Sequence, residues 1–152
     1  MHKETSSYDI AGRILWERDA RRAGTRLDAE LVGKPPRPRY RFAIDTPVYD
    51  DQRLVTVTPR SLGSHEDPVV FLDGARCLRH RWPNGSLCMW LDSDPPEMRW
   101  VAADGFLALV GHIRQHAWCE AVCRSGEPWP KPESPGNHPR KAECPSCLGR
   151  GE

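Results

Sequence analysis

The chain has almost no charge excess and no long apolar run. Its formal net charge is +1 over 152 residues, whereas proteins that bind nucleic acid or anionic membrane draw affinity from a clear basic excess. No stretch approaches the roughly 20 apolar residues that span a bilayer. The polar, charged N-terminal segment lacks the apolar run of a signal peptide. We therefore expect a cytoplasmic protein that binds neither nucleic acid nor membrane.

The chain also shows no internal repeat, and its length suits one domain with a short appendage. We expect a domain over residues 1–136 and a C-terminal tail over residues 137–152. A core of this size needs no disulfides. The six cysteines therefore indicate catalysis or metal binding, because a reducing compartment keeps thiols reduced.

The first part of the chain is rich in residues that favour helix. Arginine, alanine, glutamate and leucine dominate residues 9–32, with Ser6 or Ser7 as the expected N-cap. Gly24 is expected to divide this helical stretch into two pieces. The proline-rich segment 33–38 then ends it, because proline cannot continue a helix.

Three strand signals follow the helical stretch. Tyr40, Phe42 and Ile44 alternate with polar or small residues, as in a half-buried strand, and residues 54–58 and 69–72 are short β-branched or apolar runs. No helical pattern separates them. The sequence therefore predicts an antiparallel strand meander and an α+β fold.

A long loop region and a second helix complete the pattern. Residues 73–103 are dense in proline, glycine, aspartate and tryptophan and show no long period, so we expect an ordered, functional loop. A helix is predicted over 104–124, with Asp104 as N-cap and Gly126 with Pro128 as its end. Its buried face is predicted from helical spacing to comprise Phe106, Leu109, Val110, Ile113, Ala117 and Ala121.

The loop contains the segment most suggestive of catalysis, running from His80 to Trp90. It places Cys88 eight residues after His80 and shortly after Asn84 and Gly85. A cysteine nucleophile needs solvent access and a donor that stabilises the oxyanion. A loop supplies access, and a nearby histidine or asparagine supplies the donor. The other interpretation of Cys88 is a small buried hydrophobe without chemistry.

Around this segment the sequence resembles ubiquitin-conjugating enzymes. The family carries Gly-x-x-Cys, here Gly85-Ser-Leu-Cys88, with an asparagine about eight residues before the cysteine. That position is His80, so the eukaryotic His-Pro-Asn motif is absent, and a histidine there resembles the prokaryotic branch. Bacterial members are also similar to four blocks of this sequence, at 53–59, 67–72, 82–90 and 126–133. The resemblance covers roughly residues 10–136.

The resemblance implies a ubiquitin-conjugating-enzyme-like fold: an N-terminal helix, an antiparallel meander, a long active-site loop and a C-terminal helix. Similar bacterial proteins are typically encoded in antiviral operons of the CBASS type. They act on a cyclic-oligonucleotide synthase of the cGAS-like class, joining its C-terminus to a target. The implied function is that of an acyltransferase that carries the synthase C-terminus as a thioester on Cys88. Because 152 residues leave no room for an adenylating module, we expect activated cargo to come from a separate activating enzyme or from the synthase partner.

The implied catalytic residues are Cys88 and His80, with no cofactor for catalysis. His80 either donates a hydrogen bond to the oxyanion or accepts the proton of an attacking amine, and its structural interpretation is a histidine that ties the loop to backbone carbonyls. Asn84 is expected to cap the turn through its side chain. We expect the loop to lower the pKa of Cys88 modestly. Three tryptophans are expected to anchor the loop by packing: Trp82, Trp90 and Trp100.

The remaining cysteines suggest a structural zinc site. Cys144 and Cys147 form a Cys-x-x-Cys near the end of the sequence, which is half of a tetrahedral site. The predicted helix 104–124 carries a stripe formed by His112, His116, Cys119 and Cys123, roughly 120° from its buried face. A tail docking on this stripe would complete a zinc site from Cys119, Cys123, Cys144 and Cys147, with His116 as a substitute ligand. The alternative is that Cys119 and Cys123 only pack, and that the tail pair is reactive or forms a disulfide.

Two other functions compete with the conjugating enzyme. The first is a non-catalytic interaction protein of the same fold that binds the synthase; the presence of Cys88 with His80 argues against it. The second is a thiol-redox protein that uses Cys144 and Cys147. A thioredoxin-like enzyme places its Cys-x-x-Cys at the start of a helix that follows a strand, whereas this pair stands near the end of the sequence.

Overall fold

A computed structural model describes residues 10–34, 36–46, 51–58, 68–74, 80–90 and 94–130 of the chain. Its elements are helix α1 (Ile10–Arg22), strands β1 (Asp28–Val32), β2 (Arg37–Thr46), β3 (Asp51–Thr58) and β4 (Val69–Leu72), the short 3-10 helices η1 (Pro96–Met98) and η2 (Ala102–Asp104), and helix α2 (Gly105–Arg124). The fold is therefore α+β, as predicted. Within these ranges, no helix is both long and apolar enough to cross a membrane.

The four strands form one antiparallel sheet in the order β1-β2-β3-β4. The predicted meander is thus confirmed for β2, β3 and β4. On β2, Tyr40, Phe42 and Ile44 are buried, whereas Arg41 and Ala43 between them are exposed. This alternation gives the sheet one apolar face and one polar face, because successive side chains of a strand point to opposite sides.

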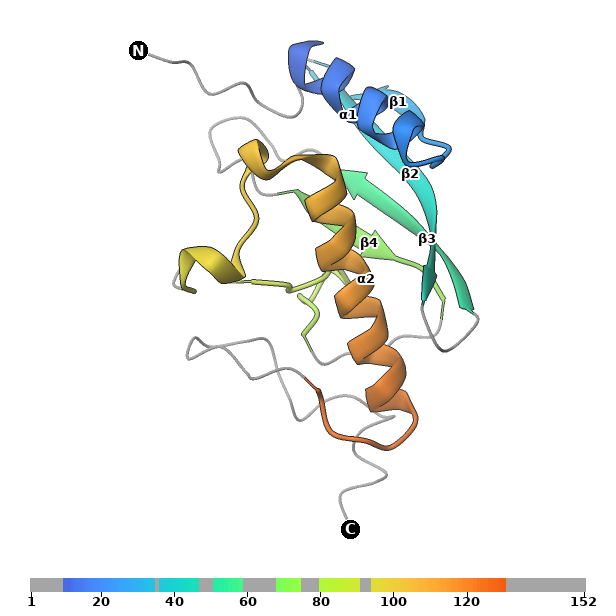
Figure 1. Cartoon of the computed structure of the whole chain (residues 1–152), viewed down its shortest axis with the longest axis vertical. Coiled ribbons are helices and arrows are strands. Elements are labelled where there is room, and N and C mark those ends of the chain that lie inside the picture. The colour runs from blue at the N-terminus through green and yellow to red at the C-terminus, as the bar shows by residue number, and fades with distance from the viewer. Residues whose placement is uncertain are drawn as a thin grey trace.

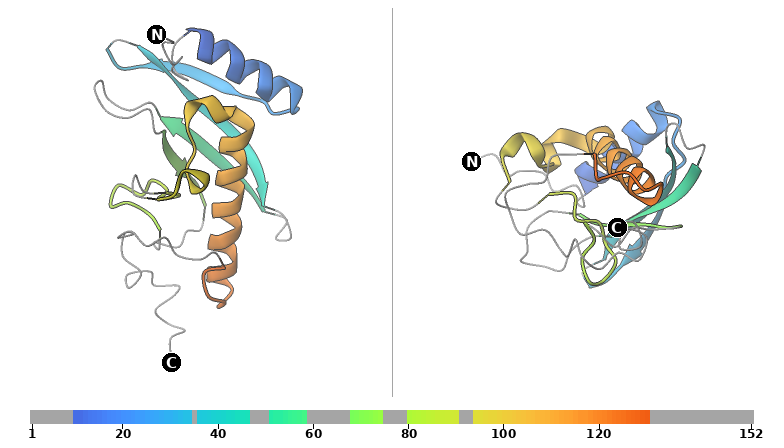
Figure 2. Two further views of the ribbon diagram at one scale, coloured as in Figure 1. Left: turned by 60° about the vertical axis from the view of Figure 1, so that its left-hand side comes forward. Right: turned by 90° about the horizontal axis from the view of Figure 1, so that it is seen from below.

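Both long helices pack on the apolar face of the sheet, with α2 lying across it (Figures 1 and 2). The ring of Trp16 on α1 lies 5.3 Å from Tyr40 of β2 and 5.4 Å from Phe106 of α2, and Phe106 lies 5.3 Å from Phe42. These aromatic contacts join the three elements into one core. The predicted buried face of α2 is confirmed at every position: Phe106, Leu109, Val110, Ile113, Ala117 and Ala121.

The predicted second helical piece before residue 33 is wrong. Helix α1 ends at Arg22, and Gly24 follows it with a φ of +70°, a left-handed conformation that suits glycine. The chain then forms β1, in which Glu30 pairs with Arg39 of β2. Pairing with an available strand edge overrides the helix propensity of this short stretch, because propensity differences are small. Ser6 and Ser7 lie outside the described residues.

Helix α2 ends as the sequence predicts. Gly126 has a φ of +104°, and its N–H donates to the carbonyl of Cys123 at 3.1 Å. The next N–H, of Glu127, donates to the carbonyl of Val122 at 3.3 Å. This pair of bonds is a Schellman motif, which satisfies carbonyls that the helix leaves open. Asp104 precedes α2 as expected, without a side-chain capping bond.

Most of the stripe on α2 that was expected to lie away from the core is also buried. His116, Cys119 and Cys123 are 5%, 0% and 3% exposed, and His112 is half-buried. Two faces of α2 are therefore covered: one by the sheet and α1, the other by the segments around residues 80–90 and 127–130. The second face carries polar side chains into the interior.

Candidate functional site

Residues 80–88 form a tight β-hairpin. Arg81 and Leu87 pair as an isolated antiparallel bridge. On one side of this bridge, the N–H of Trp82 donates to the carbonyl of Ser86 at 2.9 Å; on the other, the N–H of Cys88 donates to the carbonyl of His80 at 2.8 Å. The hairpin thus brings Cys88 and His80, eight positions apart in sequence, directly opposite one another.

The turn of the hairpin follows from its residues. The N–H of Gly85 donates to the carbonyl of Trp82 at 2.8 Å, with Pro83 in the second position of the turn, which its fixed φ suits. The Oδ1 atom of Asn84 accepts hydrogen bonds from the N–H and the hydroxyl of Ser86, at 2.9 and 2.6 Å. The prediction that Asn84 caps the turn is therefore confirmed.

The hairpin is attached to the edge of the sheet. The N–H of Leu87 donates to the carbonyl of Val70 in β4 at 2.8 Å. The guanidinium of Arg81 reaches the carbonyl of Leu72, also in β4, at 3.3 Å, and the carbonyl of Gly85 in the turn at 2.9 Å. The position of Cys88 relative to the core is thus set by hydrogen bonds to β4.

Cys88 itself is covered. Its side chain belongs to a residue that is 2% exposed. Burial, together with the negative charge of Asp94, raises the pKa of the Cys88 thiol to about 12, because desolvation disfavours the thiolate. The expectations of an accessible cysteine with a lowered pKa are both wrong for this arrangement of the chain. At neutral pH the thiol is protonated.

His80 has an unusual backbone conformation. It has a φ of +59°, and among the described residues it is the only non-glycine residue with a positive φ. Such a conformation costs on the order of 1–3 kcal/mol and is found preferentially at functional sites. The imidazole is buried, and its centroid lies 4.4 Å from that of Trp129, which also packs edge-on against His116 at 5.3 Å. Trp129 therefore contacts both histidine rings.

The three loop tryptophans differ in their environment. Trp100 is 1% exposed, and its Nε1–H donates to the carbonyl of Gly105 at 2.9 Å. Trp90 is also buried and lies edge-on to His112 at 5.3 Å. These two are packing anchors, as predicted. Trp82 is 38% exposed, so the prediction fails there, because the turn of the hairpin directs it away from the core.

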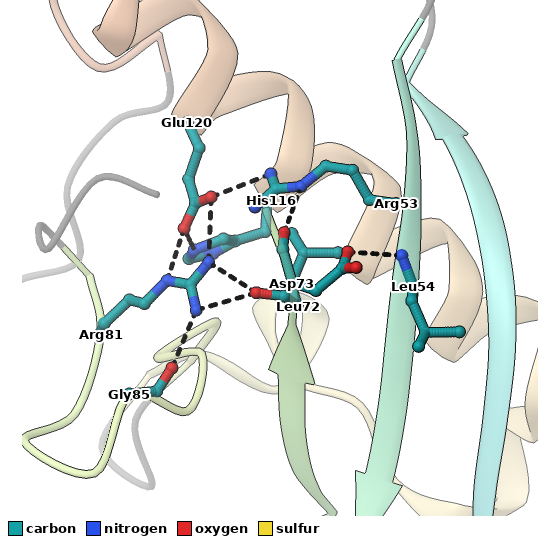
Figure 3. Close-up of polar contacts among 8 residues, drawn as sticks. All are labelled: Arg53, Leu54, Leu72, Asp73, Arg81, Gly85, His116 and Glu120. Carbon is teal, nitrogen blue, oxygen red and sulfur yellow. Dashed lines mark hydrogen bonds and ion pairs between the residues drawn. The ribbon is translucent and has the colours of Figure 1, made fainter. Parts of the chain in front are cut away.

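A buried ionic cluster lies where the hairpin, β3 and α2 meet (Figure 3). Glu120 of α2 is 0% exposed. Arg81 donates to it through Nε, 2.7 Å from Oε1, and through Nη2, 3.1 Å from Oε2. Arg53 of β3 donates through Nη1 at 3.0 Å, and His116 Nε2 lies 3.5 Å from Oε1. One carboxylate thus joins the hairpin, the sheet and α2.

The ionic cluster keeps Glu120 charged. Burial alone would raise its pKa, but the contacts with His116 and Arg81 outweigh burial and lower the pKa to about 2. A buried carboxylate is tolerated only when it is paired and hydrogen-bonded. The cluster meets that condition, since each carboxylate oxygen accepts a hydrogen bond from an arginine.

The sequence interpretation missed this cluster, although a signal was present. Arg53 has the inward register of β3 with Val55 and Val57, and Glu120 follows Ala117 of the predicted buried face by three positions. Opposite charges at two core-facing positions indicate a buried pair. No comparable signal pointed to Trp129, whose role depends on the path of the chain after α2.

The predicted zinc site is only half within the described part of the chain. Cys119 and Cys123 lie one helical turn apart on α2 and are both buried. Cys144 and Cys147 lie outside the described residues. Across the ranges that the structure does describe, no group of three or more His, Cys, Asp or Glu side chains is arranged to hold a metal ion. Structural zinc stays a prediction.

No protein-family model, curated protein or solved structure matches the chain. The α+β fold and the geometry around Cys88 and His80 are therefore the observations that bear on function. Assignment to the ubiquitin-conjugating enzymes stays a prediction from the motifs of the sequence.

Proposed function

We propose that the chain is a ubiquitin-conjugating-like acyltransferase in which Cys88 carries the C-terminal carboxyl group of a partner protein as a thioester. The observation that carries the proposal is the bond from the Cys88 N–H to the His80 carbonyl, 2.8 Å across the hairpin. It places the backbone of Cys88 opposite that of His80, which is held at a φ of +59°. Backbone strain of this kind is found preferentially at sites of chemistry.

The order of elements supports the same proposal. A first helix, an antiparallel meander, a loop carrying the cysteine and a long second helix follow one another, which is the order that the resemblance implies. We propose a ubiquitin-conjugating-enzyme-like domain over residues 1–136. Its proposed partner is a cyclic-oligonucleotide synthase of the cGAS-like class, with a separate activating enzyme as a further source of activated cargo, in bacterial antiviral defence in the cytoplasm.

The proposed reaction has two steps. The Cys88 thiol loses its proton, and its sulfur attacks the carbonyl carbon of the donor's thioester; a new carbon–sulfur bond forms, and the donor sulfur leaves as a thiolate that takes up a proton. An amine of the target then attacks the same carbon and loses a proton. An amide forms, and the Cys88 sulfur leaves and is reprotonated.

His80 serves this reaction in one of two ways. Its imidazole donates a hydrogen bond to the oxyanion of each tetrahedral intermediate, or it accepts the proton that the attacking amine loses. Contact with Trp129 restricts the imidazole plane, which favours a fixed donor, because a positioned group stabilises developing charge without reorganisation.

The burial of Cys88 defines what the reaction requires. A thiol that is 2% exposed with a pKa of about 12 does not attack a thioester in this conformation. Binding of the donor must therefore uncover the sulfur and favour the thiolate. The protein at rest is then inert toward adventitious electrophiles.

The same burial favours a second candidate function. Buried cysteines with raised pKa values are usually structural, so the chain is alternatively a non-catalytic protein of this fold that binds the synthase. In that case Cys88 is a buried packing residue at the end of the hairpin and forms no adduct. The two functions differ in whether binding to the synthase leads to a covalent product.

Expression of the chain together with a cyclic-oligonucleotide synthase tests the proposal. We expect wild type to form an adduct that reductant removes, seen on non-reducing gels and by intact mass, and we expect Cys88→Ala to form none. The adduct mass identifies the cargo. Cys119→Ala is the matched control: Cys119 is equally buried, at 0% exposed, but lies on α2. This variant should therefore form the thioester adduct on Cys88, here called loading, as wild type does.

If wild type and Cys88→Ala give identical species both with the synthase alone and with a separate activating enzyme expressed as well, the thioester carrier is excluded. Co-purification of both with the synthase then establishes the binding protein. An adduct lost in Cys119→Ala as well as in Cys88→Ala would show that loading depends on overall packing rather than on the Cys88 thiol.

A further inference from the structure

Arg81 has a special place in the hairpin. It directly follows His80, and its bridge partner Leu87 directly precedes Cys88. Its guanidinium contacts three parts of the molecule at once: the turn at the Gly85 carbonyl, β4 at the Leu72 carbonyl, and α2 at Glu120. Any rotation of the hairpin about β4 breaks at least one of these contacts.

The contact between Arg81 and Glu120 has a fixed geometry. Two nitrogens of the planar guanidinium face two oxygens of the carboxylate, at 2.7 and 3.1 Å. Such paired bonds specify orientation as well as distance. Buried ion pairs contribute little net stability compared with apolar residues of similar volume. The pair therefore fixes the orientation of the hairpin, which apolar packing alone would not do.

We propose that Arg81 and Glu120 are a positioning pair that holds the hairpin closed against the core, keeping Cys88 covered and His80 opposite it. The pair acts through the hydrogen bond between the Cys88 N–H and the His80 carbonyl. The consequence for acyl transfer rests on the proposed function of Cys88, but the consequence for the exposure of Cys88 does not.

Arg53 offers a matched control within the same cluster. It donates to the same carboxylate at 3.0 Å and is buried to the same degree, 2% exposed against 4% for Arg81. It also donates to the carbonyl of Asp73, which follows β4. Within the described part of the chain, these two bonds join Arg53 to α2 and to the end of β4, and neither reaches the hairpin. Loss of either arginine thus weakens the cluster, but only loss of Arg81 releases the hairpin.

The experiment compares Arg81→Met with Arg53→Met on the full chain. Arg81→Met removes the bonds to Gly85 and Leu72 as well as those to Glu120, so urea unfolding first measures the stability of each variant, and alkylation rates are compared at equal unfolding free energy. Cys88 is then alkylated with iodoacetamide under native conditions, and its modification is quantified by peptide mapping, which separates it from the other cysteines. We expect Arg81→Met to accelerate Cys88 alkylation by about tenfold or more relative to Arg53→Met. Where wild type forms the thioester on Cys88, we expect Arg81→Met to form it about tenfold to a hundredfold more slowly, because misplaced reacting groups react more slowly.

Equal alkylation rates in the two variants would overturn the proposal, because Cys88 exposure would then follow stability alone. Where a methionine variant does not fold, Arg81→Lys and Arg53→Lys replace the pair: lysine keeps the charge but not the two-pronged geometry, so the same difference is expected. Absence of loading in wild type refutes the proposed function of Cys88, whereas the alkylation comparison still decides whether Arg81 holds the hairpin closed.

Discussion

At the scale of single residues, the environment of Cys88 determines whether its thiol is ionised and accessible when no partner is bound. The thiol stands at the end of a hairpin whose sequence is typical of an exposed turn, yet it is buried. Its raised pKa follows from that burial and from Asp94. A carrier cysteine of this kind stays protonated until a partner changes its surroundings. Cys88 is therefore a switchable nucleophile under the proposed function and an inert packing residue under the alternative.

The raised pKa of Cys88 predicts a loss of stability at high pH. The unfolded thiol ionises near its ordinary pKa of 9.0, whereas the folded thiol holds its proton to about 12. The contribution of Cys88 is thus fully present below pH 9 and decreases as the pH rises toward 12, since the unfolded state releases the proton first. Between pH 9 and 11, wild type should lose about 1 kcal/mol per pH unit relative to Cys88→Ala.

Urea unfolding of both proteins at several pH values from 8 to about 11 measures this difference. Cys88→Ala is the internal reference, because every other titrating group is shared. A difference in unfolding free energy that does not change with pH would show that the Cys88 thiol ionises alike in both states, and hence that it is not buried in solution.

At the scale of elements, the hairpin of residues 80–88 carries both the sequence motif and the two candidate site residues, Cys88 and His80. Its turn chemistry is local: proline in the second position, an asparagine side chain that caps, and Gly85 with a φ of +90°. Its attachment is not local, because Leu87 bonds to β4 and Arg81 reaches α2. The motif therefore determines the shape of the hairpin, and the core determines where it points.

Substitution of Asn84 tests how much the turn of the hairpin contributes to stability. Asn84→Ala removes the acceptor for the N–H and the hydroxyl of Ser86 and should cost about 1 kcal/mol of unfolding free energy. Asn84→Asp keeps an acceptor oxygen in that position, now of a carboxylate, and its unfolding free energy should stay within a few tenths of a kcal/mol of wild type. Both are measured by urea unfolding.

Loading of Cys88 distinguishes a turn cap from a catalytic asparagine. As a cap, Asn84 is replaceable by aspartate, so Asn84→Asp should load at the wild-type rate. A large loss of loading in Asn84→Asp with unchanged stability would instead place the amide group of Asn84 in the reaction.

At the scale of the whole molecule, Glu120 connects elements that are far apart in sequence. Its carboxylate bonds to Arg53, 67 residues away, and to Arg81, 39 residues away. The sheet, the hairpin and α2 therefore share one buried charge cluster (Figure 3). The stability of the whole fold then depends on the ionisation of this carboxylate.

The lowered pKa of Glu120 predicts that the fold loses stability at low pH. Its folded pKa is about 2, against 4.5 for the unfolded chain. The stability that it contributes is present above pH 4.5 and is lost as the pH falls toward 2, because the unfolded state takes up the proton first. At pH 7, Glu120→Gln should be less stable than wild type by about 3 kcal/mol, the usual cost of breaking a buried pair.

The difference between wild type and Glu120→Gln should shrink as unfolding is measured at pH 5, 4 and 3. Glu17→Gln is the control: Glu17 pairs with Arg13 on the surface, at 2.7 Å with both side chains more than a third exposed, so it should change stability by less than about 1 kcal/mol. A Glu120→Gln difference that stays constant down to pH 3 would contradict a charged Glu120 in the core.

Much of the fold was predictable because its signals are local. The alternation of Tyr40, Phe42 and Ile44 follows from the two-residue period of a strand, and the buried face of α2 follows from helical spacing. Gly126 ends α2 through its own backbone freedom. Asn84 caps its turn because acceptor and donor lie two residues apart. In each case the partners are close in sequence, so the pattern of residues determines the outcome.

Only the tertiary structure decided the rest. Residues 28–32 became strand β1 because β2 offered an edge to pair with. Cys88 is buried at the end of a hairpin that bonds to β4 and to α2. Arg53, Arg81 and Glu120 form one cluster because three distant segments meet. Burial, and with it the pKa of a thiol or a carboxylate, depends on what packs around the group. The amino-acid sequence thus determined which residues were available for chemistry, and long-range packing determined their ionisation and access.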